Sequence, residues 1–400
     1  MKITVLFLTI FSMLVTLSPS AWAYDGSVTV TSGQTIYYNY NSSDQTIEIT
    51  YPGNNMMETW SEYTAPIGAL VIPDSISHNG VNCPVVTIRN YAFKDCSDLT
   101  AITIGNSIVS IGDYAFQYCS GLTSVTIGNS TTSIGGYAFW FCSGLTSVIF
   151  NADSCLSAGS DVFYGCDNLT NATFGNNVKL IPGRLFENCG SLTSVSIGSG
   201  VTSIGSGAFF GCTNLREISY EGSIAQWCNI SFGGSFSNPI YYAHTLSING
   251  SHVTNLVIPD SVASIGDYAF QYCTGLTSVT IGSGVTSIGY GAFNGVDIPT
   301  IISLVENPFT IIGKTSDYST FSQNTFNNAT LYVPMGTIDK YKAVGGWKDF
   351  MFIEENVTSG IKGILSDSDK NYPKYDINGR RSDVPQKGIN VISGNKIILK

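Results

Sequence analysis

Hydrophobic and polar residues recur along most of the chain in one short unit. Its clearest form, LTSVTI at 122–127, has apolar residues in the first, fourth and sixth places. Successive side chains of a strand point to opposite faces, so Val125 and Ile127 share one face and Thr126 lies on the other. Gly128 and a turn rich in Asn, Ser and Thr follow, then a second Ile and a Tyr-Ala-Phe segment. The pattern predicts one short strand per unit, with its Val and Ile in a core.

The unit is a true internal repeat. The stretch IGDYAFQYCSGLTSVTIG at 111–128 returns at 265–282 with only Ser120 replaced, by Thr274. The Phe of the unit recurs every 23 or 24 residues, first at Phe93, Phe116, Phe139, Phe163, Phe186 and Phe209, and later at Phe270 and Phe293. This period, with this spacing of Leu, Val and Ile, is typical of leucine-rich repeats. A single unit cannot bury its own apolar face, so the units must stack. We therefore predict a leucine-rich-repeat solenoid that is mainly β and curved, with short parallel strands on one side and loops and short helical turns on the other.

The repeat also divides the chain into five expected segments. These are a signal peptide at 1–23, an N-terminal β cap at 24–66, the solenoid at 67–304 with an insertion at about 221–250, a C-terminal cap at 305–356, and a linker with a tail hairpin at 357–400, considered as a sorting signal. Within them the pattern predicts a loop at 78–84, a helical turn at 223–230, strands at 301–304 and 329–334, and a helix at 337–344. The tail hairpin is expected to turn at Gly394-Asn395.

Residues 1–23 have the features of a secretory signal. Lys2 precedes an apolar run at 3–17, and Pro19 precedes the small-residue site Ala21-Trp22-Ala23. We expect cleavage before Tyr24. A membrane anchor is the competing interpretation, but the run is short for a span, and the sequence has no second apolar segment of about 20 residues. The chain is therefore expected to be exported, to the cell surface or beyond it.

The charge balance excludes nucleic acid as a partner. The chain has 18 basic and 28 acidic residues, and removal of the signal removes only Lys2, which leaves 17 − 28 = −11. Charged residues make up only 12% of the chain while Gly, Ser, Thr and Asn abound, so the surface is mostly neutral and rich in hydroxyl groups. The periodic placement of the 43% hydrophobic residues argues against disorder.

Seven of the ten cysteines lie three residues after a repeat Phe, at Cys96, Cys119, Cys142, Cys166, Cys189, Cys212 and Cys273. Such an interior position suits a buried thiol. Stacked coils would bring these residues about 5 Å apart, so disulfides stay open as an alternative. Seven is odd, however, and complete pairing is impossible. No CxxC spacing indicates a metal.

The sequence contains no catalytic, cofactor-binding or metal-binding set of residues. His78, His244 and His252 lack metal-ligand spacing. The GKT at 313–315 lacks the glycine-rich cradle of a phosphate loop. No G-x-S-x-G nucleophile elbow occurs. The sequence therefore favours a protein that is not an enzyme.

Two surfaces are candidates for binding. The first is the outward column of the repeated strands, which reads Thr103, Thr126, Ile149, Thr173, Ser196, Ser219, Val257 and Thr280. It offers small hydroxyl and methyl groups with almost no charge, although Thr and Ser also favour exposed strand positions without any ligand. The second is a group of aromatic residues in the insertion, Trp227, Tyr241 and Tyr242 with Phe232 and Phe236. Exposed aromatics would form a hot spot for a sugar or protein; the alternative is that they pack the enlarged coil onto its neighbours.

The chain resembles the BspA-like family of leucine-rich-repeat proteins over roughly residues 67–355. The resemblance rests on the repeated SIG-x-x-AF-x-x-C-x-x-LT-x-V-x-I unit, IAQW with NPIYYAH, ATLYVP-x-GT, and GWKDF. The tail, YDINGRR to KGINVISGNKIILK, resembles the C-terminal tails of exported Bacteroides-type proteins, some of which are sorting signals. The resemblance implies a surface-associated or secreted protein, with adhesion to host matrix proteins or other microbes known for some members. It supplies no catalytic residues.

We therefore expect a non-enzymatic, exported or cell-surface protein for adhesion or recognition. Its expected partner is a host extracellular-matrix or microbial surface protein or glycan, bound by a monomer with no nucleic acid and no transmembrane span. The alternative is a structural surface component without a specific ligand.

Overall fold

The computed structural model describes residues 24–53, 59–60, 62–153 and 155–356, and the backbone of 374–375, 388–392 and 395–399. The predicted signal peptide and most of the predicted linker lie outside the described residues. The chain forms two compact units, Met1–Glu355 and Asn356–Lys400.

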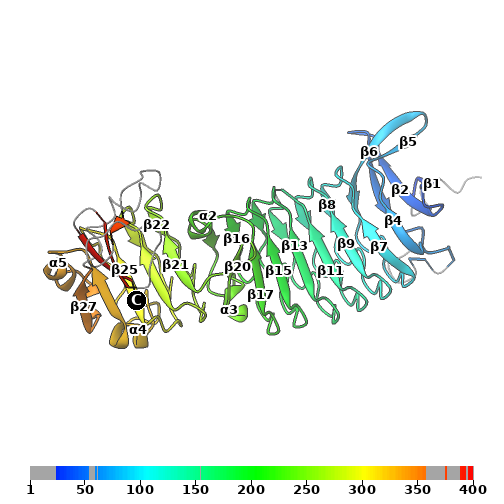
Figure 1. The fold of residues 1–400 in the computed structure, drawn as a ribbon. Helices are drawn as coiled ribbons and strands as arrows, with labels where there is room; N and C mark the ends of the chain where they lie inside the picture. The colour runs from blue at the N-terminus through cyan, green and yellow to red at the C-terminus, as the bar shows by residue number, and fades with distance from the viewer. Residues whose placement is uncertain are drawn as a thin grey trace, which may run out of the picture. The chain divides into compact units, whose positions relative to one another are not determined.

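The first unit is a stack of coils, each with one strand of the LTSVTI type. Neighbouring strands pair in parallel in chain order and form a nine-stranded sheet, closed at one end by an antiparallel pair (Figure 1). Its strands are β4 (Gly68–Val71), β7 (Leu99–Thr103), β9 (Ser124–Ile127), β11 (Ser147–Phe150), β13 (Asn171–Phe174), β15 (Ser194–Ile197), β17 (Glu217–Tyr220), β19 (Ser247–Ile248) and β20 (Ser251–His252). The predicted solenoid is confirmed.

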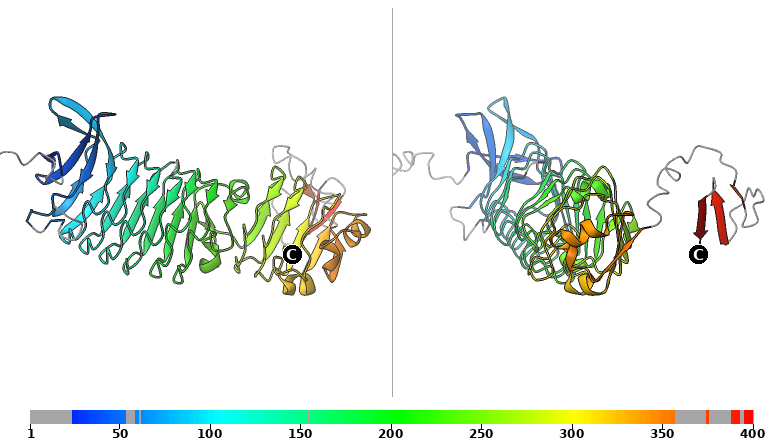
Figure 2. Two further views of the ribbon diagram at one scale, coloured as in Figure 1. Left: turned by 180° about the vertical axis from the view of Figure 1, so that it is seen from behind. Right: turned by 90° about the vertical axis from the view of Figure 1, so that its left-hand side faces the viewer.

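A second row of strands, which the sequence did not predict, lies at the second Ile of each unit. These strands have two residues each: β8 (Ser110–Ile111), β10 (Ser133–Ile134), β12 (Ser157–Ala158), β14 (Leu180–Ile181), β16 (Ser203–Ile204), β18 (Ser231–Phe232), β22 (Ser264–Ile265) and β24 (Ser287–Ile288). The expected short helical turns in the regular coils are absent among the described residues, where helices occur only in the insertion and after Phe321. Viewed nearly end-on, the coils superimpose (Figure 2, right).

The N-terminal strands extend this second row. β1 (Gly26–Thr29), β2 (Thr35–Asn41) and β3 (Thr46–Thr50) are antiparallel, and β3 pairs in parallel with β6 (Val81–Ile88), next to β8. The loop expected at 78–84 is wrong: β5 (Ser75–His78) and β6 form an antiparallel hairpin there. The extra residues of the first coil pair with one another, because a tight turn at Asn79-Gly80 brings the two arms together.

A separate five-stranded sheet follows the insertion. It consists of β21 (Asn255–Ile258), β23 (Ser278–Ile281), β25 (Thr300–Ser303), β26 (Thr330–Val333) and β27 (Phe352–Glu355), all parallel. Three short helices connect its last strands: α4 (Gln323–Asn328), α5 (Ile338–Ala343) and η2 (Trp347–Asp349). The strands predicted at 301–304 and 329–334 and the helix predicted at 337–344 are confirmed, whereas α4 was not predicted. Figure 2 (left) shows the five-stranded sheet as a group of strands distinct from the nine-stranded sheet.

The second unit holds the tail hairpin. β28 (Lys374–Tyr375), β29 (Gly388–Ile392) and β30 (Asn395–Leu399) form an antiparallel sheet. The expected hairpin is confirmed, although Asn395 belongs to a strand rather than to the turn, and Gly394 lies outside the described residues.

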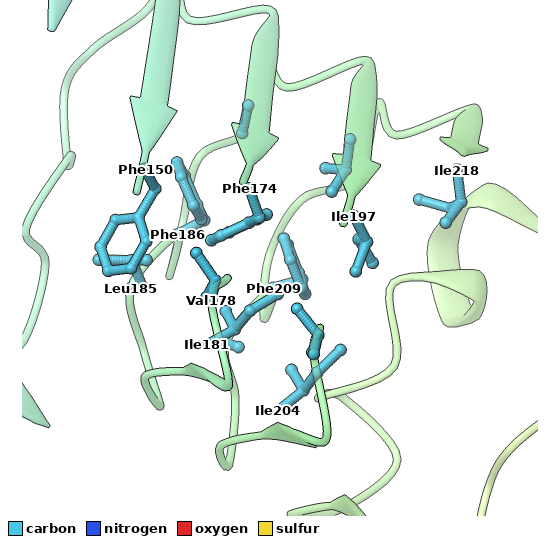
Figure 3. Packing of buried hydrophobic residues seen from close by; sticks show 14 of the residues in the cluster. Phe150, Phe174, Val178, Ile181, Leu185, Phe186, Ile197, Ile204, Phe209 and Ile218 are labelled. Atoms are coloured by element: carbon cyan, nitrogen blue, oxygen red, sulfur yellow. The ribbon is translucent and has the colours of Figure 1, made fainter. Parts of the chain in front are cut away.

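A stack of Phe rings runs through the core of the first unit. Ring centroids from Phe93 to Phe209 are 5.2, 4.9, 5.1, 5.2 and 5.9 Å apart in sequence, with nearly parallel planes. Figure 3 shows Phe186 and Phe209 facing the inward side chains Phe174 and Ile197 of the strands. Trp60 covers the first ring of the stack at 6.3 Å. The repeat Phe therefore joins each coil to the next.

All ten cysteines are buried and free. Five thiols of the column donate to the carbonyl oxygen of the Phe in the preceding coil: Cys119 to Phe93 (3.0 Å), Cys142 to Phe116 (3.1 Å), Cys166 to Phe139 (3.2 Å), Cys189 to Phe163 (3.7 Å) and Cys212 to Phe186 (3.2 Å). The interpretation as buried thiols is confirmed. The thiol stabilises the stack twice, as an apolar filler and as a donor to a carbonyl that water cannot reach.

The first prediction concerns the Phe stack. Phe116→Ala should lower the free energy of unfolding by about 3–5 kcal/mol, because Phe116 is fully buried and its loss leaves a cavity between two rings. Chemical denaturation followed by circular dichroism measures the change. Ile149→Ala, at an outward strand position that is 44% exposed, is the control and should change stability far less. A loss below about 1 kcal/mol for Phe116→Ala would contradict the assignment of the stack as the core.

The second prediction concerns alkaline pH. Burial raises the pKa of the Cys155 and Cys228 thiols from 9.0 to about 12. Above pH 9 the unfolded chain therefore loses thiol protons that the folded chain keeps, so the unfolded state binds fewer protons and stability falls as pH rises. The fall should be about 1 kcal/mol per thiol and pH unit between pH 9 and 12. Urea unfolding at several pH values measures it, and Cys155→Ala should reduce the slope. An unchanged slope would show that Cys155 does not contribute.

Candidate binding surfaces

Six of the eight residues predicted for the outward column form one continuous row on the nine-stranded sheet. Strand pairing places Thr103, Thr126, Ile149, Thr173, Ser196 and Ser219 directly beside one another in that order. The other two, Val257 and Thr280, pair with each other in the five-stranded sheet. The prediction of one continuous column of eight residues is therefore wrong. After Ser219 the next paired residue is Ser247 of the insertion, and not Val257.

A second outward row, which was not predicted from the sequence, runs two residues earlier on the same strands. It consists of Ala101, Ser124, Ser147, Asn171, Ser194 and Glu217, again paired in register. The alternation of a strand with period two would have identified it, because residues two apart share a face. We call the two rows together the strand face.

Hydroxyl groups on this side of the solenoid fall into two classes. Thr123, Thr146, Thr170 and Thr193, which precede the strands, donate their Oγ1 to a carbonyl oxygen one coil earlier, over 2.9 to 3.3 Å. By contrast, within the described chain the outward hydroxyls of Thr103, Thr126, Thr173, Ser196 and Ser219 bond to no other protein group. The first class holds the coils together, and the second class is available to a ligand.

The second candidate surface is corrected by the burial of Trp227. The indole is completely buried, its Nε1 donates to the carbonyl oxygen of Ala269 at 2.8 Å, and its ring meets Tyr220 edge-to-face at 5.2 Å. Phe232 is also buried. Trp227 therefore cannot contact a ligand.

The position of Ala269 explains why the insertion carries a Trp. In regular coils the residue before the repeat Phe accepts the backbone N–H of the preceding Phe, as Ala138 does from Phe116 at 2.7 Å. The insertion interrupts this chain of bonds ahead of Ala269. Trp227 and Asn238 replace the missing donor, since Nδ2 of Asn238 also reaches the Ala269 oxygen at 3.0 Å.

The local sequence of the insertion places both donors. The predicted helical turn is α2 (Ile224–Cys228), which begins with a capping box in which Ser223 and Gln226 each satisfy the other's backbone N–H. Trp227 lies on its buried side. A second helix, α3 (Ile240–Ala243), starts just after Asn238.

Tyr241 and Tyr242 of α3 are only partly exposed. The hydroxyl of Tyr242 accepts the backbone N–H of Gly211 at 3.0 Å, which ties the insertion to the preceding coil. Tyr241 packs edge-to-face with Phe236 at 4.8 Å and with Tyr272 at 4.9 Å. These contacts support the packing interpretation for most of the aromatic group.

Of the three histidines, His78 takes part in packing, whereas His244 and His252 are exposed. His78 stacks on Tyr40 at 4.3 Å, and Nδ1 of His244 lies 3.3 Å from the carbonyl oxygen of Tyr272. Across the described ranges, no group of three or more His, Cys, Asp or Glu residues is arranged to hold a metal ion. In the same part of the chain no helix is long and apolar enough to cross a membrane.

These coils match a known family. The family model described as BspA type leucine rich repeat region matches with six copies, over residues 86–216, 180–252 and 243–342, which is more than half of the chain. The protein belongs to the BspA-type leucine-rich-repeat family. A comparison with curated proteins gives no match.

Solved leucine-rich-repeat structures resemble this BspA-type chain. A protein of Bacteroides ovatus is 23% identical over 84% of this chain and 79% of its own, with a TM-score of 0.40. A protein of T. pallidum is 29% identical over 46% of this chain and 78% of its own, with a TM-score of 0.36. A leucine rich cell surface protein of Faecalibacterium prausnitzii is 19% identical over 84% and 97%, with a TM-score of 0.32.

The third prediction tests the role of the insertion in this BspA-type solenoid. Trp227→Phe should keep most of the packing but remove the donor to Ala269, and should lower the free energy of unfolding by about 1–3 kcal/mol. Equilibrium denaturation measures the loss. Asn238→Ala is the companion variant, and the double variant should lose more than either single one because both donors serve one oxygen. Two neutral single variants would refute this role.

Proposed function

We propose that this BspA-type protein is non-enzymatic, acts at the cell surface or after secretion, and binds a protein or glycan ligand through the strand face. The observation that supports binding there is the row of outward hydroxyls that the fold itself does not use. The predicted secretory signal supports export. The expected partner is a host extracellular-matrix or microbial surface molecule.

The chemistry of the strand face favours recognition by shape and hydrogen bonding. Parallel strands lie about 4.8 Å apart, so the two rows form a regular grid of groups that both donate and accept hydrogen bonds. Ile149 adds an exposed apolar side chain in the middle of the grid. In the two rows, the only charged residue is Glu217, at one end. Binding should therefore depend little on salt, unlike binding driven by charge.

The fourth prediction places three charges in the grid. The full chain and the variant Thr126→Lys, Thr173→Lys, Ser196→Lys are titrated against an array of extracellular-matrix proteins, microbial surface proteins and glycans. The wild type should bind at least one member saturably, and the variant should lose at least about tenfold in affinity, because three ammonium groups would disrupt the neutral contact.

A matched control carries the same added charge elsewhere. Ser130→Lys, Asn177→Lys, Thr213→Lys changes three exposed turn residues and should bind like the wild type. Equal loss in both variants would indicate a general effect of charge and reject the strand face as the site. No binding by the wild type to any member would favour a structural surface component instead.

A further inference from the structure

A cluster of aromatic residues lies on the turns of the first four coils, away from the strands. Its members are Tyr91, Tyr114, Tyr118, Tyr137, Trp140, Phe141 and Tyr164, and we call it the aromatic edge. The rings of Tyr91, Tyr114 and Tyr137 stack at 5.2 and 5.1 Å. Trp140 stands across this stack, at 65° to Tyr137, and also contacts Tyr118 and Phe141 at 5.6 and 5.1 Å. Together they form one continuous aromatic surface.

The backbone is strained at five of these seven residues, all except Trp140 and Tyr164. Every regular coil has two residues with positive φ, two before and two after the repeat Phe, a conformation that costs free energy for any residue except glycine. At the second position, later coils hold Gly165, Asn188, Gly211 and Gly295, residues that tolerate this conformation. The second and third coils instead hold Tyr118 and Phe141, with φ of 61° and 56°, and the coil of Phe270 holds Tyr272, which packs against Tyr241 of the insertion at 4.9 Å.

A comparison of the coils shows which residue types folding requires at this turn position and which it does not. Gly165, Gly211 and Gly295 show that the fold accepts glycine here, so a bulky aromatic is not required to form the turn. Tyr118 remains 42% exposed and Phe141 37%, so their rings are not completely used in the core. Strain retained at exposed residues is a mark of a functional position.

The aromatic edge ends at a surface pocket formed by three successive coils, the third, fourth and fifth. The pocket has a volume of about 370 Å³ and is lined by Phe141, Tyr164, Asp167, Asn188 and Ser191, among others. Its lining therefore combines the rings of Phe141 and Tyr164 with a carboxylate, an amide and a hydroxyl. Nδ2 of Asn188 donates to Oδ1 of Asp161 at 3.3 Å, which fixes the amide.

This combination selects a class of ligand. A pyranose ring has an apolar face of C–H groups, which packs on an aromatic ring, and a rim of hydroxyls, which needs carboxylate and amide partners. No Lys or Arg lines the pocket, and Asp167 would repel an anionic sugar. We propose that the aromatic edge and its pocket bind a neutral glycan, at a site separate from the strand face.

The fifth prediction tests this site on the full chain. Cellohexaose, chitohexaose, maltohexaose and mannohexaose are titrated by calorimetry, with tryptophan fluorescence as the second readout. At least one should bind, and the double variant Tyr118→Gly, Phe141→Gly should lose about tenfold or more in affinity. Its thermal midpoint should stay equal or rise, because glycine relieves the strain. A purely structural role for these rings would instead lower the midpoint.

Two controls separate this proposal from others. Tyr272→Gly makes the same change at a residue with φ of 58° in a coil outside the aromatic edge, and should leave saccharide binding unchanged. The strand-face lysine variant should also bind normally. The proposal is overturned if none of the four saccharides binds, or if the double variant binds them like the wild type. It is also overturned if decaproline, used as a probe for a proline-rich peptide ligand, binds at this site in place of the saccharides.

Discussion

Each coil of this protein is incomplete without the next one. The backbone N–H of a repeat Phe donates to a carbonyl oxygen in the following coil, its ring stacks on the following ring, and the Cys thiol donates to a carbonyl of the preceding coil. These three contacts all cross from coil to coil, so stability accumulates along the stack and fails wherever the stack is left open. The ends and every interruption therefore need special residues.

Those special residues are aromatic and buried. Trp60 covers the first Phe ring, and Phe321 continues the stack after Phe293 at 5.2 Å before Trp347 and Phe350 close it. At the insertion, Trp227 donates the hydrogen bond to the Ala269 carbonyl oxygen that a repeat Phe of the preceding coil would otherwise donate. At Trp227 and Trp347 the indole combines a large apolar face with one N–H donor, which bonds to the carbonyl oxygens of Ala269 and Phe309 respectively. The insertion thus acts as an internal joint, and it also divides the strand face from the five-stranded sheet.

The positions that repeat and the positions that vary have different roles. The inward Leu, Val, Ile, Phe and Cys recur because the stack demands them, and they say nothing about a ligand. Residues with a role in binding should therefore lie at positions where the coils differ, although the fold would accept the same residue type in every coil. The left-handed turn position is such a place, since glycine serves in some coils and Tyr118 or Phe141 in others. The strand face is another, since Ile149 interrupts a row of hydroxyls there.

The sequence by itself determined the solenoid, the inward residues and the buried thiols, because a repeat of fixed length places equivalent side chains in equivalent surroundings. It also located the outward column, since alternation along a strand is a local property. Only the tertiary structure decided the rest. Trp227 is buried because Ala269, forty-two residues later, lacks a donor, and no local pattern records that need. The second row of strands was missed because two residues are too few to show a period. The aromatic edge likewise joins residues from four coils, and its strained backbone becomes visible only when the turns are built.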